Sequence, residues 1–424
     1  MVIQRPITIA GVEGGGTSFI ATIAIVHSVE GDKCIPNTRL EILHHISIPS
    51  MHPEATLKSC ASFFESHRPI HGYAALGIAT FGPVGVNHAY PATYGRICNS
   101  SPKKEWRNVN ILSPILQACT SVNGIAPPYR IETDVNAPAM AEFMHVSKFN
   151  DKITSLAYVT VGTGIGVGLV INSKPVHGMM HPEAGHVATV SLSGDLFDGY
   201  SWGKDSCPFR GKGTVEGMAC SVALTERLLM NKDTSDHIDK ENDAVNNIDG
   251  KLKENDIDGI TRECLKDIPD SHEIWDHAAN ALANLCVTLT LVTSVERIVF
   301  GGGVMNRNIL YKKIRERTRK LLNGYLDHLD PVSTVEGLDD YIGPSIWKDQ
   351  AGLVGALVLA QSVYEEQKGI IKEKVDIVSK ITTTNIVQKY DVNNQHFWNG
   401  LFAGIALTGF GALGVTMLTQ QRRS

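Results

Sequence analysis

The sequence lacks any block of basic residues, any cysteine framework and any apolar leader, and these gaps exclude several protein classes. The net charge is −5 over 424 residues, so the bulk charge does not attract nucleic acid. The first apolar strand pattern begins at Ile7, which leaves no room for a signal peptide. We therefore expect no nucleic-acid partner and a cytosolic setting with reduced thiols. The eight cysteines lack regular spacing: Cys34, Cys60, Cys98, Cys119, Cys207, Cys220, Cys264 and Cys286.

Two glycine-rich turns are the most informative feature that is present. They occupy Gly11–Thr17 and Gly162–Gly168, and each is flanked by apolar runs of β type. Glycines let backbone N–H groups approach an anion with no Cβ in the way, and threonine hydroxyls add donors. The composition, 43% hydrophobic and 20% charged, is that of a globular chain long enough for two domains. Two matching turns predict a duplicated α/β fold that binds a polyphosphate between its lobes.

The apolar runs around these turns predict the same order of elements twice. After the first strand, turn and strand, the pattern predicts a third strand, a helix and a buried strand, at 40–48, 53–67 and 74–79. The second half repeats the order from Ser155, with a third strand expected near 186–191 and a later strand at 297–300.

Seven short motifs follow one another in an order that resembles the ROK family of sugar kinases, most nearly its bacterial-type fructokinases. They are Gly11–Thr17, Thr80–Pro83, Ser101–Trp106, Thr133–Ala137, Thr160–Gly168, His181–His186 and Gly301–Met305. The resemblance covers roughly residues 6–362. It implies a duplicated actin-like (ribonuclease H-like) two-lobe α/β fold, and ATP-dependent phosphorylation of a hexose with ATP and Mg²⁺ as cofactors.

The resemblance also implies a division of the chain into lobes. The N-terminal lobe is 1–130 with 346–363 and carries the first phosphate loop and the sugar side. The C-terminal lobe is 131–345 and carries the catalytic Asp, the second phosphate loop and the adenine side. Within it, 232–258 is acidic and poor in apolar residues, which predicts a flexible insertion. Residues 364–395 predict a charged linker.

Asp134 follows an apolar strand and precedes a helical stretch, a position that suits two compatible roles. A carboxylate at a strand end facing a cleft can accept the proton of a substrate hydroxyl as that oxygen attacks phosphorus. An Asp in this place can also cap the helix that follows. The resemblance implies that Asp134 is the catalytic base.

The resemblance implies two further sets of contacts. Nucleotide and phosphate contacts are Gly14, Gly15, Gly16, Thr17, Gly162, Thr163, Gly164, Gly301, Gly302 and Gly303. Sugar contacts are Gly82, Pro83, Thr133, Glu183 and His186. Taken alone, Glu183 would be an ordinary loop carboxylate and His186 a histidine that is hydrogen-bonded within the protein. A carboxylate that accepts hydrogen bonds from two vicinal hydroxyls, however, favours a sugar as the ligand. Glu13 replaces the Asp common in the first phosphate loop and is expected to hold Mg²⁺ through water.

The stretch after His186 departs from the zinc site of the family. Fructokinases of this branch follow that His with Cys, His and Cys ligands in tetrahedral coordination. Here His186 and Cys207 remain, but Arg210 stands where the second His belongs and no Cys lies near Gly213. We therefore expect no structural zinc, and we expect Arg210 and Lys212 to supply the lost positive charge by ion pairing.

The sequence favours fructose, phosphorylated at its 6-hydroxyl, as the substrate. Thr133 precedes the Asp where glucokinases of the family have Asn, and the dense Cys-x-Cys-Gly zinc signature of those kinases is missing. The alternatives are a kinase for glucose, mannose or an N-acetylated amino sugar, and a weak or inactive membrane-tethered sugar sensor. The presence of Asp134 and of both glycine turns favours retained activity. A homodimer is left open.

Residues 397–419 contain no ionisable side chain and predict a single transmembrane helix. At about 1.5 Å per residue this helix would be roughly 34 Å long, against a hydrocarbon core of about 30 Å. We expect a cytosolic enzyme body anchored by this tail in the mitochondrial outer membrane or the endoplasmic reticulum. The alternative is a buried helix in a soluble cytoplasmic protein. In the anchored form Arg422 and Arg423 would lie on the far side of the membrane, against the positive-inside rule.

Overall fold

The computed structural model describes residues 7–27, 39–50, 52–150, 152–201, 211–235, 265–326 and 335–383. Residues 1–364 form one compact unit, and residues 365–424 form a second. Cys207, Arg210 and most of the predicted acidic insertion lie outside the described residues. So does the stretch 397–419. Among the helices that are described, none combines the length and the apolar character needed to cross a membrane.

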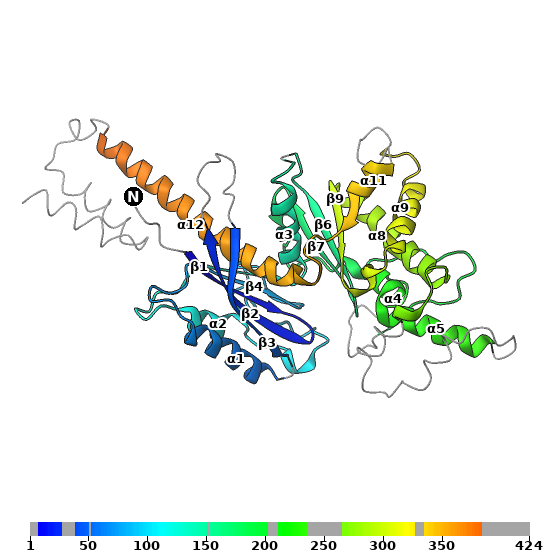
Figure 1. Cartoon of the computed structure of the whole chain (residues 1–424), viewed down its shortest axis with the longest axis horizontal. Helices are drawn as coiled ribbons and strands as arrows, with labels where there is room; N and C mark the ends of the chain where they lie inside the picture. Colours follow the sequence, from blue (N-terminus) through cyan, green and yellow to red (C-terminus); the bar gives the residue numbers. More distant parts are fainter. Residues whose placement is uncertain are drawn as a thin grey trace, which may run out of the picture. The chain divides into compact units, whose positions relative to one another are not determined.

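The first sheet contains five strands in the order β3-β2-β1-β4-β5 (Figure 1). Strands β1 and β2 pair antiparallel across the first glycine turn, β3 pairs antiparallel with β2, and β4 and β5 run parallel to β1. The predicted third strand and buried strand of this half are confirmed. The bounds are β1 (Ile7–Gly14), β2 (Ser18–His27), β3 (Arg39–Pro49), β4 (Leu76–Thr80) and β5 (Tyr129–Thr133).

Helices cover both faces of strands β1, β2 and β4, which are apolar on both sides, whereas most of β3 is exposed. On one face lie α1 (Pro53–Ser66) and α2 (Leu112–Cys119), which pack into a core with Phe19, Phe64 and Trp106. The other face packs against the first half of α12 (Ala351–Thr383) through Leu353 and Leu357. The approach of α12 is close: a Cβ at Gly77 would lie 1.9 Å from the carbonyl oxygen of Ala356.

The second sheet repeats the topology of the first, in the order β10-β9-β6-β7-β8. Strands β6, β7 and β8 pair antiparallel, and β9 and β10 run parallel to β6. The duplication predicted from the two glycine turns is confirmed at this level. The bounds are β6 (Leu156–Val161), β7 (Ile165–Ile171), β8 (Lys174–Pro175), β9 (Arg297–Gly301) and β10 (Ile342–Pro344).

The third strand of this half is not where the sequence pattern placed it, so the prediction of a strand near 186–191 was wrong. Asn172 and Ser173 both adopt positive φ, 50° and 65°, which is the backbone of a tight two-residue hairpin turn. The chain therefore reverses at once into the short strand β8. The later stretch forms only the 3-10 helix η2 (Ala184–His186) and an isolated bridge between Ala188 and Thr214.

Helices pack around the second sheet in the same way. One face is covered by α8, whose Trp275 and Leu282 lie in a core with Phe300 of β9. The other face packs against α3 and α12 in a core that also includes Ala79 of β4, so this layer is shared between the sheets. The helices of this half are α3 (Asn136–Val146), α4 (Val215–Ala219), α5 (Ser221–Ser235), α8 (Ile274–Thr293), α9 (Ile309–Leu322) and α11 (Val335–Tyr341).

Two of the boundaries predicted between parts of the chain lie inside a strand or a helix of the structure. The predicted end of the N-terminal lobe at residue 130 lies within β5, which belongs to the first sheet as far as Thr133. The predicted linker 364–395 is helical to Thr383 as part of α12.

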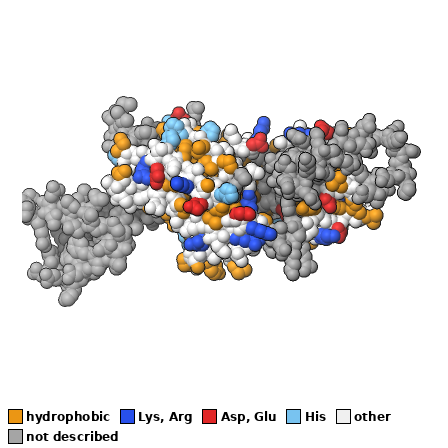
Figure 2. Space-filling view, turned by 90° about the horizontal axis from the view of Figure 1, so that it is seen from below, with side chains coloured by type: hydrophobic (Ala, Val, Ile, Leu, Met, Phe, Trp, Pro, Cys, Tyr) orange, Lys and Arg blue, Asp and Glu red, His pale blue; other side chains and the backbone are white. Residues whose placement is uncertain are grey.

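On the face shown in Figure 2, Lys and Arg side chains lie beside Asp and Glu side chains, so this part of the surface does not carry charge of one sign.

Candidate active site

The first group of candidate residues lies where three parallel strands end. Glu13 of β1 pairs in register with Ala79 of β4, and Thr80 at the end of β4 pairs with Thr133 at the end of β5. Asp134 follows directly, and its backbone N–H donates to the carbonyl of Thr80 at 2.8 Å. Because parallel strands bring their carboxyl ends to one edge of a sheet, the fold places Glu13 and Asp134 together.

Burial makes the carboxyl groups of Glu13 and Asp134 weaker acids than usual. It is the main cause that raises the pKa of Glu13 to about 7, and the charge of Asp134 adds to it. Burial also raises the pKa of Asp134 to about 6, against the lowering effects of its backbone hydrogen bond and of Lys103. A general base works best when its pKa lies near the working pH. Asp134 is therefore mostly ionised at neutral pH and still able to hold a proton.

The alternative role of Asp134, capping the helix α3, is taken by its neighbour. The hydroxyl of Thr133 accepts the N–H of Asn136 at 3.0 Å, in the first turn of α3. Thr133 itself is 2% exposed. Its hydroxyl is thus engaged in the helix start, and the predicted sugar contact by Thr133 stays a prediction. The catalytic role of Asp134 stays a prediction as well.

A divalent cation fits the edge that carries Glu13. Its Oε2 atom is buried and has no hydrogen-bond partner among the described residues. A hard cation such as Mg²⁺ binds oxygen ligands, keeps several waters and takes the rest of its ligands from nucleotide phosphates. In the part of the chain that the structure describes, no group of three or more His, Cys, Asp or Glu side chains lies close enough to hold a metal. Glu13 would therefore hold Mg²⁺ only together with waters and the nucleotide phosphates.

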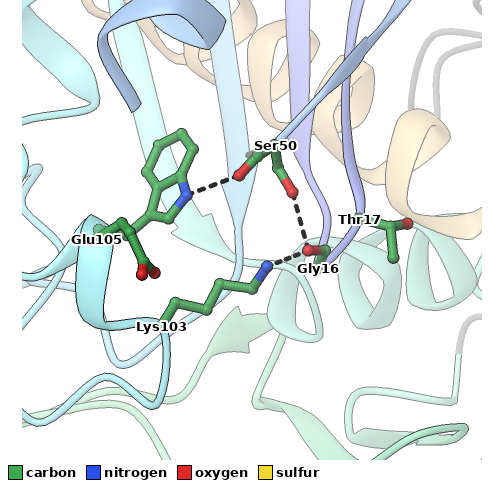
Figure 3. Close-up of a pocket in the computed structure, with 6 residues that line it drawn as sticks. Gly16, Thr17, Ser50, Lys103 and Glu105 are labelled. Carbon is green, nitrogen blue, oxygen red and sulfur yellow. Dashed lines mark hydrogen bonds between the residues drawn. The ribbon is translucent and has the colours of Figure 1, made fainter. Parts of the chain in front are cut away.

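The first phosphate loop, Gly14–Thr17, is fastened from its carbonyl side (Figure 3). The carbonyl of Gly16 accepts hydrogen bonds from the Ser50 hydroxyl, at 2.8 Å, and from the Lys103 ammonium. The backbone N–H of Ser50 donates to the Thr17 carbonyl at 3.0 Å. Gly14 is required, because a Cβ there would lie 2.7 Å from the Thr80 hydroxyl. The loop is held in place while Gly16 and Thr17 remain exposed.

The second phosphate loop, Gly162–Gly164, is held by Glu216 from α4. The Glu216 Oε2 atom accepts the N–H of Ile165 at 2.8 Å, and a Cβ at Gly164 would lie 2.7 Å from the same oxygen. The carbonyl of Gly162 accepts the N–H of Ser221 at 2.8 Å. Only glycine fits at position 164 while this carboxylate supports the turn.

The predicted adenine loop, Gly301–Gly303, packs against the end of β6. Gly302 adopts a φ of 89°, and a Cβ there would lie 2.4 Å from the carbonyl of Val161. The 3-10 helix η3 (Gly303–Asn306) follows at once. This arrangement places the loop beside the second phosphate loop, which begins at Gly162. Nucleotide contact by these glycines stays a prediction.

The predicted sugar residues come from two loops that touch. The backbone N–H of Val84, after Gly82 and Pro83, donates to Nε2 of His181 at 3.2 Å. Two residues further along the chain, burial and the charges of Asp134 and Glu216 raise the pKa of Glu183 to about 7. Loop residues of the first half and of the second half thus meet next to Asp134.

His186 lies beside Glu216 at the same place. Its Nδ1 atom is 3.7 Å from Glu216 Oε1, and burial lowers its pKa while Glu216 opposes this. Glu216 therefore contacts both the second phosphate loop and a predicted sugar residue. The sequence gives no local signal for Glu216, because its partner Ile165 lies 51 positions away.

Ion pairs hold the segment in which the family has zinc. Lys212 pairs with Asp198 at 2.8 Å, as expected from the sequence, although both side chains are exposed. A stronger contact is buried: Arg227 of α5 makes two hydrogen bonds to Asp195, at 2.6 and 2.9 Å, and His277 of α8 lies 3.1 Å from the same carboxylate. Cys207 lies outside the described residues, so the pairing of His186 and Cys207 in a residual zinc site stays untested.

The comparisons with known proteins agree with this geometry. The ROK family model matches residues 9–363. This chain belongs to the ROK family. It is 32% identical over 355 residues to a fructokinase of Zymomonas mobilis, covering 82% of this chain and 95% of that protein. It is 29% identical over 354 residues to a fructokinase of Pediococcus pentosaceus, covering 84% and 98%.

Solved structures of the ROK family share the fold. A hexokinase of Thermus thermophilus superposes with a TM-score of 0.56 at 19% identity, over 85% of this chain and all of that one. A glucokinase of Streptomyces griseus, solved with glucose and AMPPNP, gives a TM-score of 0.55 at 20% identity, over 84% of this chain and all of that one. The predicted two-lobe α/β sugar kinase fold is confirmed.

Proposed function

We propose that this ATP-dependent sugar kinase of the ROK family prefers fructose as its acceptor and converts it to fructose 6-phosphate. The observation that carries the proposal is Asp134, held at a strand end with a pKa raised to about 6, beside Glu13, whose Oε2 atom is buried, and between the two glycine turns of the sequence. Phosphoryl transfer needs positioning, charge neutralisation and a base for the attacking hydroxyl. This site contains residues suited to all three.

In the proposed reaction the sugar hydroxyl gives its proton to Asp134 as its oxygen bonds to the γ-phosphorus, and the bond to the leaving ADP breaks. Bound Mg²⁺ would neutralise charge on the nucleotide phosphates. Glu183 orients the sugar, and its pKa near 7 lets its carboxyl group either accept or donate a hydrogen bond to a hydroxyl. The two glycine turns offer backbone N–H groups to the phosphates.

Fructose is proposed over other hexoses on two grounds. The relatives that align over most of their length are named fructokinases, at 32% and 29% identity. Thr133 precedes the base in place of the Asn typical of glucokinases. An N-acetylmannosamine kinase of Vibrio vulnificus also matches, at 26% identity over 181 residues, so amino sugars belong in the test.

The test is a panel of sugars given to the full-length chain with MgATP while ADP release is followed. We expect the highest kcat/KM for fructose, above glucose, mannose and N-acetylmannosamine. Higher kcat/KM for another sugar would replace fructose and keep the kinase. Folded protein that releases no ADP with any sugar would overturn the kinase and favour the sugar-sensing alternative.

We also propose that residues 397–419 anchor the chain in an intracellular membrane. The support is the absence of any ionisable side chain over 23 residues. In a cell lysate, alkaline carbonate should leave the full-length chain in the membrane pellet and release a variant ending at residue 390. Recovery of both in the supernatant would overturn the anchor.

A further inference from the structure

A cavity opens beside the first phosphate loop, on the side of the N-terminal lobe (Figure 3). Its volume is about 340 Å³, and it is lined by Gly16, Thr17, Ser50, Lys103, Glu105 and Trp106. The exposed tip of the phosphate loop thus forms one wall of the cavity. The opposite wall is formed by Glu105 and Trp106 of the 3-10 helix η1 (Lys104–Trp106) and by Lys103 just before it.

The wall that carries Lys103 is rigid. Trp106 is 1% exposed, stacks on Phe19 with ring centroids 4.9 Å apart, and donates its Nε1–H to the Ser50 carbonyl at 2.9 Å. The backbone N–H of Lys103 donates to the Ser101 hydroxyl at 3.3 Å, and its carbonyl accepts the N–H of Trp106 at 3.0 Å. The backbone of Lys103 is therefore fixed, and only its side chain can change direction.

The Lys103 side chain reaches from this wall to the phosphate loop. Its ammonium lies 4.9 Å from the centre of the Phe81 ring and donates to the carbonyl of Gly16 (Figure 3). The same positive charge lowers the pKa of Asp134. Lys103 thus contacts the loop that would bind the transferred phosphate, and its charge acts on the residue that would take the proton of the acceptor.

A neutral carbonyl is a modest partner for an ammonium group. The bond to the carbonyl does not neutralise the ammonium, whereas a phosphate oxygen adds the attraction between opposite charges, and lysine is a common point-charge ligand of phosphate. Gly16, Thr17 and Lys103 all line the same cavity, so a phosphoryl group bound in it beside Thr17 would present its charged oxygens within reach of the Lys103 side chain. The ammonium can exchange the carbonyl for these oxygens by rotation about its own side-chain bonds.

We propose that Lys103 is a further catalytic residue, whose ammonium contacts the phosphoryl oxygens as the group passes from the nucleotide to the sugar. The inference rests on the proposed function. The bonds made and broken are those of the proposed reaction: the acceptor oxygen bonds to phosphorus, the bond to the leaving ADP breaks, and the acceptor proton goes to Asp134. Lys103 keeps its own protons throughout and supplies positive charge alone.

The test compares Lys103→Met with Lys104→Met in the full-length chain. Lys104 is the next residue, is exposed, and does not line the cavity, so it is a matched control. We expect Lys103→Met to lower kcat about 100-fold or more, the usual cost of losing one group that stabilises transition-state charge. We expect Lys104→Met to stay within twofold of wild type. Because the Lys103 charge lowers the pKa of Asp134, the loss of kcat/KM at low pH should also begin at a higher pH in Lys103→Met, but not in Lys104→Met.

A binding measurement separates this role from simple fastening of the loop. Calorimetry is run with the sugar that wild type phosphorylates and with its phosphorylated product. Lys103→Met should bind the sugar as wild type does, which also shows that it is folded, and should bind the product at least tenfold more weakly. Equal weakening of both ligands, or no weakening of either, would overturn the inference.

The wild-type assay keeps the two proposals apart. An active wild type whose Lys103→Met variant matches Lys104→Met in kcat would overturn the role of Lys103 alone. Folded wild-type protein without sugar-dependent ADP release would overturn the proposed function, and the inference with it.

Discussion

Asp134 owes its position and its acidity to different parts of its surroundings. Its backbone is fixed by the bond to Thr80, and its carboxylate is spared from capping because Thr133 accepts the first helical N–H. Its pKa is set by burial, which raises it, and by Lys103, which lowers it. Position and acidity can therefore be perturbed separately, by changing the strand ends or by changing Lys103.

The pH dependence of the reaction follows from these acidities. Because burial raises the pKa of Asp134 to about 6, the base becomes protonated and inactive as pH falls through that value. We expect kcat/KM for the sugar, measured from pH 5 to 9 with saturating MgATP, to be level at high pH and to fall toward tenfold per unit at low pH. The carboxyls of Glu13 and Glu183, with pKa values near 7, interact with it, so the observed value belongs to the cluster. A profile that stays level down to pH 5 would contradict the assignment.

Individual residues differ in how far the sequence alone could predict them. The glycines of the phosphate loops were predictable, because a run of glycines between two apolar strands is a local pattern. Lys103 and Glu216 were not, because their partners are distant: Lys103 bonds to Gly16, 87 positions away, and Glu216 to Ile165, 51 positions away. Only the fold brings such pairs together.

Among elements, local turn geometry limited the prediction. The first hairpin was predictable from its glycines. The hairpin between β7 and β8 depends on positive φ at Asn172 and Ser173, and Asn-Ser is a weaker turn signal than Asn-Gly. The third strand was consequently placed too late, in a segment that the structure folds around η2 and the ion pairs of Asp195.

The buried pair between Asp195 and Arg227 should be the main support of that segment. Arg227→Met would leave the Asp195 carboxylate buried, where both side chains are at most 4% exposed. We expect the free energy of unfolding, measured by urea denaturation, to fall by about 3–5 kcal/mol. Lys212→Met breaks an exposed pair in the same segment and should cost less than about 1 kcal/mol. Equal losses in the two variants would show that burial does not decide the effect.

A second contact between elements depends on pH. His177, just after β8, lies 3.2 Å from the buried Glu132 of β5, and this hydrogen bond raises the pKa of His177 above its usual 6.5, against burial and the nearby charge of Arg130. The neighbouring His181 also faces His177. A raised pKa in the folded state gives stability that is complete below pH 6.5 and is lost as pH rises through the raised value.

His177→Gln should therefore be less stable than wild type at pH 6 and equal to it at pH 9. The expected difference at pH 6 is about 1 kcal/mol or less, because His177 is partly exposed. Urea denaturation at both pH values measures it. A difference that is the same at both pH values would mean that packing, rather than the charge of His177, holds the loop.

At the scale of the whole unit 1–364, the duplication explains why the chain has two glycine turns that are predicted to bind phosphate. Each sheet has the same strand order, so each presents its first hairpin turn in the same place. Asp134 follows the last strand of the first sheet, and Glu183 comes from a loop of the second half that contacts the loop after Gly82. The site is therefore complete only when both halves are folded, which agrees with a match to the ROK family over residues 9–363.

The central claim is that Asp134 acts as the base of sugar phosphorylation, and Asp134→Asn tests it most directly. The variant keeps the size of the side chain and the backbone bond to Thr80 but cannot accept the proton. With MgATP and the sugar preferred by wild type at pH 7.5, we predict that sugar-dependent ADP release falls by about 100- to 10,000-fold, the usual contribution of a general base. Sugar-dependent ADP release equal to that of wild type, from folded Asp134→Asn, would contradict the claim.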